Sequence, residues 1–329
     1  MRIPSLPLPP NRFLCLLGLA VFPSLSLPAS AQDWIVLPDK AHPYKSPSMA
    51  APKSDRALAY PRALQEVARI RPTGQDGGET GWLQFAFRGE VLFLPEALVV
   101  QRAGDRAGEG GDLPIGGERV GRDHPLPLDY KPSDLVSIAP RWNYHPGRKN
   151  RLRAEAAEMA ERMLEDARRD GIELRVVSAH RSAWVQRSLY LQKIAKAGLG
   201  QKVVAKPGQS EHQLGTALDV CGLDPGTVLR PSFAETPEGR WVKGNGARYG
   251  FVLTYTDEAV AARPRRRADD EGYVPEPWHV RYVGARTAEI SERSGEGGPS
   301  EDCGSRASRV RTGSVNTRKP GSREIRRIE

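Results

Sequence analysis

The spacing of apolar positions along residues 124–286 predicts a domain in which helices and strands are mixed. Over residues 150–170 the apolar positions recur every three or four residues, which predicts an amphipathic helix that ends at Gly171. Apolar residues then alternate with polar ones over 172–176, as in a half-buried strand. A second helix is predicted over residues 183–197, with Ser182 as its N-cap and Gly198 as its stop.

Further elements follow in the second half of this domain. Leu218, Val220 and Cys221 suggest a strand that carries Asp219 near its end. A helix is predicted over 238–247, a strand over 251–255, and a surface loop over the charged residues 261–271. The elements show no regular βαβ alternation. We therefore expect an α+β fold, an antiparallel sheet flanked by helices.

The pattern upstream predicts a small β-rich module over residues 56–102. Short strands are expected over 67–70, 82–87 and 91–94, separated by glycine-containing turns. The sequence from Gly81 through these last two strands resembles the small Src-homology-3-like barrels of bacterial wall enzymes. That resemblance implies a module that binds the wall or positions the enzyme. A β-rich packing extension of the following domain is the alternative.

The N-terminus has the pattern of a secretory signal peptide over residues 1–31. Arg2 and Arg12 precede an apolar run over 13–22, and Ala29-Ser30-Ala31 supplies a cleavage site. The run is too short for a membrane span, which needs about 20 apolar residues. We expect an exported protein, periplasmic or extracellular, with no stable membrane span.

Three segments are expected to lack a packed structure. Residues 32–55 are rich in Pro, Ala, Lys and Ser and are interpreted as a linker, and the Gly-rich, charged residues 103–123 as a second one. Residues 287–329 are expected to form a disordered basic tail. Contact of this tail with an anionic wall polymer or lipid is the alternative.

The formal net charge of +9 is concentrated at the two ends of the chain. Residues 1–31 carry +2 and residues 304–329 carry +6, so the rest is close to neutral, at about +1. This distribution argues against a nucleic-acid-binding surface. Only Cys221 and Cys303 follow the signal peptide. They could pair in an oxidising compartment, or Cys221 could be buried and Cys303 free.

Candidate chemistry lies in Ser210–Asp219, which reads S-E-H-Q-L-G-T-A-L-D, and in Glu276-Pro277-Trp278-His279. Two histidines and a carboxylate, with a spare carboxylate nearby, suit a catalytic zinc with three protein ligands and a fourth position for water. Glu276 would then be the general base. A single histidine taken alone is more often a hydrogen-bonded structural residue than a ligand. Asp219 could cap a turn and Glu276 could lie in a surface loop.

Together these motifs resemble the LAS metallopeptidases, in particular the VanY-type D-alanyl-D-alanine carboxypeptidases. The resemblance covers residues 124–286. Further matching motifs are Ser178-Ala179-His180-Arg181-Ser182, Trp241, Asn245, Tyr249-Gly250-Phe251 and Tyr282-Val283-Gly284. His180 departs from the pattern, since the family usually has tyrosine before this arginine.

The resemblance implies roles for individual residues. His212, Asp219 and His279 would hold Zn²⁺, with Glu276 as general base. Arg181 would bind a substrate carboxylate or stabilise an oxyanion, because its planar guanidinium carries a permanent charge. A surface salt bridge is the alternative for Arg181. The residues expected to line the substrate cleft beside it are Gln186, Ser210 and Trp278.

The function implied is that of an exported zinc carboxypeptidase that removes a terminal D-alanine from peptidoglycan stem peptides. The family also includes L,D-carboxypeptidases, dipeptidases and endopeptidases, and the motifs do not separate these activities. A non-catalytic wall-binding protein is the alternative from another class. The presence of Glu276 beside all three candidate ligands argues against it, because a protein without turnover has no need of the base.

Overall fold

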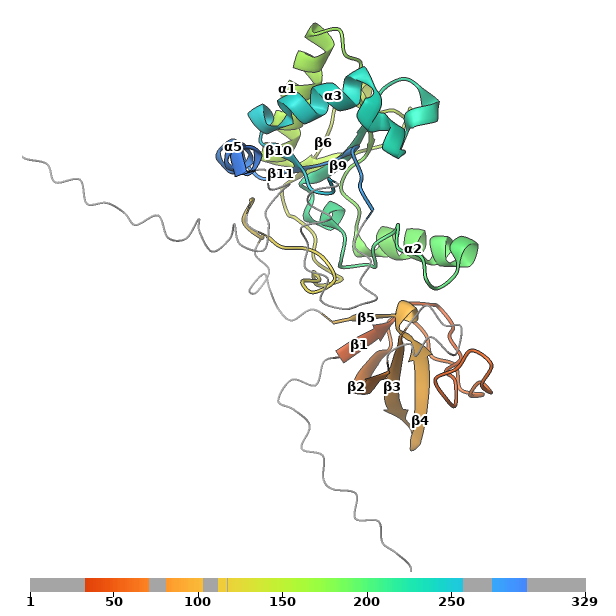
Figure 1. Ribbon diagram of the computed structural model, residues 1–329. Coiled ribbons are helices and arrows are strands. Elements are labelled where there is room, and N and C mark those ends of the chain that lie inside the picture. Colours follow the sequence, from red (N-terminus) through yellow and green to blue (C-terminus); the bar gives the residue numbers. More distant parts are fainter. Residues whose placement is uncertain (1–32, 71–80, 103–111, 117, 257–273, 295–329) are drawn as a thin grey trace, which may run out of the picture. The chain divides into compact units, whose positions relative to one another are not determined.

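The computed structural model describes residues 33–70, 81–102, 112–116, 118–256 and 274–294 (Figure 1). The predicted signal peptide, the loop over 261–271, Cys303 and most of the predicted tail lie outside the described residues, so the pairing of Cys221 stays untested. Cys221 itself is buried. None of the described helices combines the length and apolar character that a membrane crossing requires.

The N-terminal part of the described chain is a five-stranded antiparallel sheet in the order β4-β3-β2-β1-β5. Its strands are β1 (Asp33–Val36), β2 (Ala63–Ile70), β3 (Trp82–Phe87), β4 (Glu90–Pro95) and β5 (Val99–Gln101). The three strands expected from the alternating pattern are therefore present. Their inward positions, such as Leu83 and Phe85, have no measurable exposure and form a separate apolar core.

The prediction of a linker over residues 32–55 was wrong. Strand β1 begins at Asp33 and pairs with both β2 and β5. Trp34 is buried, and Tyr44 forms isolated bridges with Lys53 and Phe93. A four-residue strand among proline and lysine residues is too short for alternation to reveal it, and it is held by its neighbours.

The following domain confirms the expected mixture of helices with an antiparallel sheet. A four-stranded sheet has the order β10-β11-β9-β8, and all its neighbours are antiparallel. Its strands are β8 (Arg175–Ser178), β9 (Ala217–Cys221), β10 (Phe251–Leu253) and β11 (His279–Tyr282). The helices are α1 (Ala154–Arg169), α2 (Ala183–Ala197), α3 (Pro237–Asn245) and α5 (Ala285–Ser294). Strands β6 (Leu135–Ser137) and β7 (Arg151–Arg153) form a separate pair.

The core of this domain lies between one face of the sheet and helices α1 and α3 (Figure 1). Met163 and Leu164 of α1 are fully buried in the same apolar core as Leu218 and Val220 of β9. Burial of one such side chain stabilises the fold by about 1.5–3 kcal/mol. Because side chains alternate between the faces of a strand, Asp219 is directed to the other face of the sheet.

Helix α2 follows the bounds predicted from its caps. The Ser182 hydroxyl accepts a hydrogen bond from the backbone N–H of Val185, and Gly198 ends the helix at a φ of 84°. The helix also contacts the N-terminal sheet. Nε of buried Arg187 donates to the carbonyl oxygen of Leu37 at 2.6 Å.

Two segments are more ordered than the sequence suggested. The second linker was expected to continue to residue 123, yet the Asp112 carboxylate accepts hydrogen bonds from Ser133 and Glu118 forms an ion pair with buried Arg281. The tail was expected to start at residue 287, but α5 continues to residue 294 and its Ala288 is fully buried. These tertiary contacts compensate for the polar composition of both segments.

Candidate metal and substrate site

Two candidate metal ligands lie directly opposite each other in neighbouring strands. Asp219 of β9 pairs with His279 of β11 in the antiparallel register. Oδ1 of Asp219 is 3.1 Å from Nδ1 of His279. Both side chains are almost fully buried on the face of the sheet that α1 and α3 leave open. The strand register therefore sets the distance between these two residues.

The third candidate ligand comes from a short 3₁₀ helix, η3 (Glu211–Leu214). Nε2 of His212 lies 3.3 Å from Oδ2 of Asp219, and Nδ1 lies 2.7 Å from the carbonyl oxygen of Ala179, which accepts its hydrogen bond. Gly215 ends η3 at a φ of 73°, where a side chain would also collide with Leu135. This explains the glycine of the motif.

The three side chains form a cluster suited to a metal ion. One ligand atom from each of His212, Asp219 and His279 lies within 4.8 Å of the others. Two imidazole nitrogens and a carboxylate oxygen are a donor set that catalytic zinc sites use. The residues present therefore fit the predicted zinc.

Glu276 is held close to the cluster by a turn. Its carbonyl oxygen accepts a hydrogen bond from the backbone N–H of His279 at 3.0 Å, so Pro277 and Trp278 occupy the central positions of a β-turn. The backbone N–H of Glu276 donates to the carbonyl oxygen of Tyr255. The Glu276 side chain lines the same cavity as the three candidate ligands.

That cavity, of about 340 Å³, brings together every site residue expected from the sequence. Besides the cluster and Glu276, it is lined by Arg181, Gln186, Ser210 and Trp278. The backbone N–H of Arg181 donates to the carbonyl oxygen of His212 at 3.1 Å, which ties the loop after β8 to η3. The cluster, the candidate base and an arginine thus line one cavity.

Two of the residues expected to line the cleft, Gln186 and Trp278, are held in place by other parts of the domain. Gln186 is buried, and its amide nitrogen donates to the carbonyl oxygen of Ala205 at 2.8 Å, which fixes the loop after α2. Trp278 belongs to the apolar core that also includes Val280. Both residues shape the cavity wall. Tyr255, which the sequence did not single out, also lines the cavity, with its ring 5.0 Å from that of His279.

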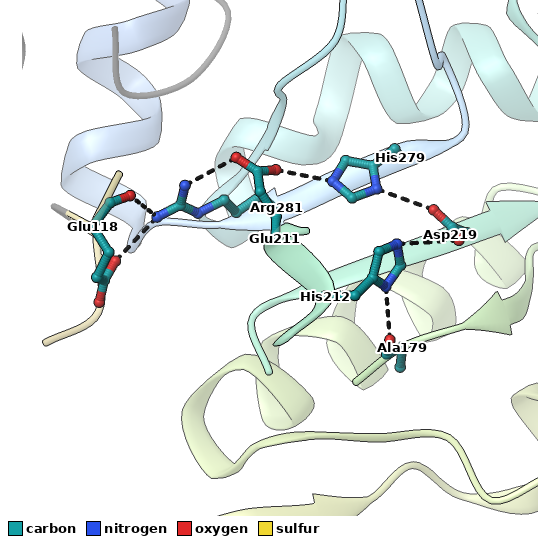
Figure 2. A network of polar contacts seen from close by, with 7 residues as sticks. All are labelled: Glu118, Ala179, Glu211, His212, Asp219, His279 and Arg281. Atoms are coloured by element: carbon teal, nitrogen blue, oxygen red, sulfur yellow. Dashed lines mark hydrogen bonds and ion pairs between the residues drawn. The ribbon is translucent and has the colours of Figure 1, made fainter. Parts of the chain in front are cut away.

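A chain of buried polar residues beside the cluster also escaped the sequence analysis (Figure 2). Oε2 of Glu211 lies 3.0 Å from Nε2 of His279, and Nη1 of Arg281 donates to Oε1 of Glu211 at 3.0 Å. Nη2 of Arg281 in turn donates to Glu118. The signal available was weak: Glu211 stands inside the histidine motif, and Arg281 follows His279 by two positions.

Burial and neighbouring charges change the acidities of these groups in different directions. Burial lowers the pKa of His212 to about 4. Burial also acts on His279, but hydrogen bonds to Asp219 and Glu211 outweigh it and raise the pKa of His279 to about 10. Burial raises the pKa of Glu276 to about 7, against the opposing effect of His279. A carboxyl group with this pKa can exchange a proton near neutrality.

The fold and the site together define a class, an α+β protein with a buried His-Asp-His cluster that lines a cavity. Comparison with known proteins agrees with this class. The sequence profile of the VanY family, described as D-alanyl-D-alanine carboxypeptidase, matches residues 149–285. The putative carboxypeptidase YodJ of Bacillus subtilis (strain 168) is 34% identical over 174 residues, which are 52% of this chain and 61% of YodJ. The chain therefore spans less than two thirds of the length of that relative.

A second relative is matched over most of its length. VanXYC of Enterococcus gallinarum, a bifunctional D-Ala-D-Ala dipeptidase and carboxypeptidase, is 31% identical over 178 residues, or 52% of this chain and 85% of VanXYC. Among solved structures, the LdcB LD-carboxypeptidase is 32% identical, with 54% of this chain and 81% of LdcB covered at a TM-score of 0.47. The chain belongs to the VanY family of D-alanyl-D-alanine carboxypeptidases. This confirms the resemblance inferred from the motifs and places the chain in a peptidase family.

Proposed function

We propose that the protein is an exported zinc-dependent carboxypeptidase that removes a terminal D-alanine from peptidoglycan stem peptides. The observation that supports this most directly is the buried cluster of His212, Asp219 and His279, which lines a cavity together with Glu276 and Arg181. Relatives named D-Ala-D-Ala peptidases add to it. Export rests on the signal-peptide pattern of residues 1–31.

The candidate ligands would hold Zn²⁺ through two imidazole nitrogens and one carboxylate. Bound there, zinc would supply a Lewis acid that polarises the scissile carbonyl and lowers the pKa of water to about 7. Glu276 accepts a proton from the attacking water, whose oxygen forms the new bond to the carbonyl carbon. As the C–N bond breaks, Glu276 passes this proton to the leaving amine.

The guanidinium of Arg181 binds a negatively charged group of the substrate. Within the described part of the chain, no hydrogen bond or ion pair of its guanidinium with a carboxylate is seen, and its Nε is buried without a partner. A substrate carboxylate at the end of the peptide would satisfy this buried group, which favours cleavage next to a free C-terminus. The planar fork also suits the oxyanion formed during hydrolysis.

Product analysis by mass spectrometry tests the proposal and names the bond. The purified protein is incubated, with and without zinc, with a stem pentapeptide that ends in D-Ala-D-Ala, with the same peptide blocked as a C-terminal amide, and with the tetrapeptide that lacks the last D-alanine. Loss of one D-alanine from the free acid alone is the expected result. Release of D-Ala-D-Ala would identify a dipeptidase, and cleavage only of a tetrapeptide would identify an L,D-carboxypeptidase. No zinc-dependent product from any of these peptides would refute the proposed activity.

A further inference from the structure

The two candidate histidine ligands present different ring nitrogens to the cluster. Nδ1 of His212 donates to the carbonyl oxygen of Ala179, so its lone pair lies on Nε2, which faces Asp219. His279 is turned the other way. Its Nδ1 faces Asp219 and its Nε2 faces the carboxylate of Glu211 (Figure 2). A group beyond the cluster must therefore hold the proton of His279 on Nε2.

Glu211 meets this requirement because an ionised carboxylate only accepts hydrogen bonds. Its two oxygens have separate partners: Oε2 lies 3.0 Å from Nε2 of His279, and Oε1 accepts from Arg281 at 3.0 Å. The side chain of Glu211 is only 4% exposed. Its carboxylate cannot turn away from the imidazole without breaking a buried ion pair.

Arg281 is fixed from its other side. Its Nη2 donates to the Glu118 carboxylate at 3.0 Å and to the Glu118 carbonyl oxygen at 2.6 Å. Arg281 follows His279 by two positions on β11, so both side chains leave the same face of the strand. Ala217 is its partner on β9 and is small, which leaves room for the guanidinium. The chain of contacts thus runs from Glu118 through Arg281 and Glu211 to the ring of His279.

We propose that Glu211, held by Arg281 and Glu118, is a positioning residue that fixes the ring of His279 so that Nδ1 is presented to the metal. The inference rests on the proposed zinc site and adds a group that raises the affinity of this site for zinc. Partners of this kind orient metal-bound histidines, and their loss typically lowers metal affinity by about 10- to 100-fold. A salt bridge that serves only stability would leave zinc affinity unchanged.

Glu211→Gln tests this role with almost no change in shape. An amide has one oxygen, and Arg281 has only donors, so Arg281 retains that oxygen and the NH₂ group turns toward Nε2 of His279. That arrangement favours the opposite tautomer of the ring. We expect the zinc affinity of the full-length protein, measured by competition with a chelator, to fall by about 10- to 100-fold. The ¹⁵N shifts of the His279 ring should report the exchange of roles between its nitrogens.

Two further variants separate positioning from folding. Glu158→Gln removes an exposed acid of α1 that pairs with Arg162, and this variant should bind zinc as the unaltered protein does. Glu118→Gln touches Arg281 but not His279, and should reduce zinc affinity less than Glu211→Gln does. If Glu211→Gln fails to fold, Glu118→Gln becomes the test of the positioning role.

The outcomes distinguish this inference from the proposed function. If the unaltered protein binds zinc tightly and a folded Glu211→Gln binds it equally tightly, the positioning role alone is overturned. If Glu211→Gln does not fold, equal zinc binding by Glu118→Gln overturns that role instead. Failure of the unaltered protein to bind zinc would overturn both. A loss of affinity graded from Glu211→Gln to Glu118→Gln, with altered His279 ring shifts, supports the inference.

Discussion

Oδ1 of Asp219 lies 3.1 Å from Nδ1 of His279, across two neighbouring antiparallel strands that are 60 residues apart in sequence. The pair joins the two motifs of the chain into one site. Because the register of β9 and β11 decides which residues oppose each other, a slip of one residue would turn one of these side chains toward the core. The geometry of the candidate metal site thus depends on the strand register as well as on the two sequence motifs.

The first prediction concerns the metal. The protein should carry about one zinc per chain, and His212→Ala, Asp219→Ala or His279→Ala should each lose it, because two remaining ligands hold zinc poorly. Elemental analysis after gel filtration measures the stoichiometry. The exposed His145→Ala is the matched control. Full zinc occupancy in His279→Ala would show that the third ligand is a different residue.

The second prediction concerns Arg181. Lysine in its place retains the charge but loses the planar fork, so a bidentate contact with a carboxylate is lost. We expect Arg181→Lys to raise KM for peptides with a free C-terminus, together with any fall in kcat. Steady-state kinetics with the free acid and the amide of one peptide measure the effect. An unchanged KM for the free acid would place the substrate carboxylate elsewhere.

The third prediction concerns the contact of α2 with the N-terminal sheet. Arg187 donates to Leu37 and to Asp39, and it lies over the rings of Tyr60 and Trp184. Arg187→Ala leaves a buried carbonyl without its donor and should lower the free energy of unfolding by about 1–3 kcal/mol. Chemical denaturation measures this change.

The control for Arg187 is Arg162→Ala, which removes an exposed ion pair on α1 and should change stability by about 0.5 kcal/mol or less. Equal effects of the two substitutions would mean that the contact with the sheet contributes nothing to stability.

Sedimentation with wall sacculi after deletion of residues 32–102 addresses the separate hypothesis that the module binds the wall. Unchanged sedimentation would refute wall binding, and packing against the following domain would remain as the role of the module.

The sequence predicted those parts of the molecule whose signals are local. The bounds of α2 follow from Ser182 and Gly198 at its ends, and the three cluster residues stand in motifs that identify the family. Glu211 and Arg281 could not be paired in advance, because their contact depends on how η3 meets β11. Local periodicity contains no information about such a contact between distant segments.

The same reason explains the segments that were taken for linkers. Glu118 lies in a Gly-rich, charged stretch, and only its ion pair with Arg281 shows that the stretch contributes to the site. Strand β1 has four residues, too few for alternation, and pairing with β2 and β5 stabilises it. In both cases tertiary contacts override a local composition that is typical of loops.

The fourth prediction concerns stability in acid. Burial lowers the pKa of His180 to about 4, from an ordinary value of 6.5, with Arg151 acting in the same direction. The unfolded chain therefore binds a proton more readily, so this contribution to stability is present above pH 6.5 and is lost as the pH falls toward 4. His180→Gln should reduce the loss of Tm over that interval.

The measurement for His180 is thermal unfolding at a series of pH values, with zinc held constant. His145→Gln, at an exposed position, is the control and should follow the unaltered protein. If His180→Gln loses Tm between pH 6.5 and 4 as steeply as the control does, other groups determine the acid sensitivity.

The last prediction separates Glu276 from the three ligands. Glu276 lines the cavity, and a turn holds it three residues from His279, yet the cluster is complete without it. As general base it is needed for proton transfer and not for metal binding. Glu276→Gln should therefore retain zinc and bind substrate, while kcat falls by roughly 10²-fold or more, the usual scale for loss of a positioned acid or base. The amide preserves the shape of the side chain, so a collapsed cavity would not explain the loss. Elemental analysis, isothermal titration with a stem peptide and steady-state kinetics measure the three quantities on one preparation. Loss of zinc would make Glu276 a ligand, and near-normal turnover would mean that another group accepts the proton.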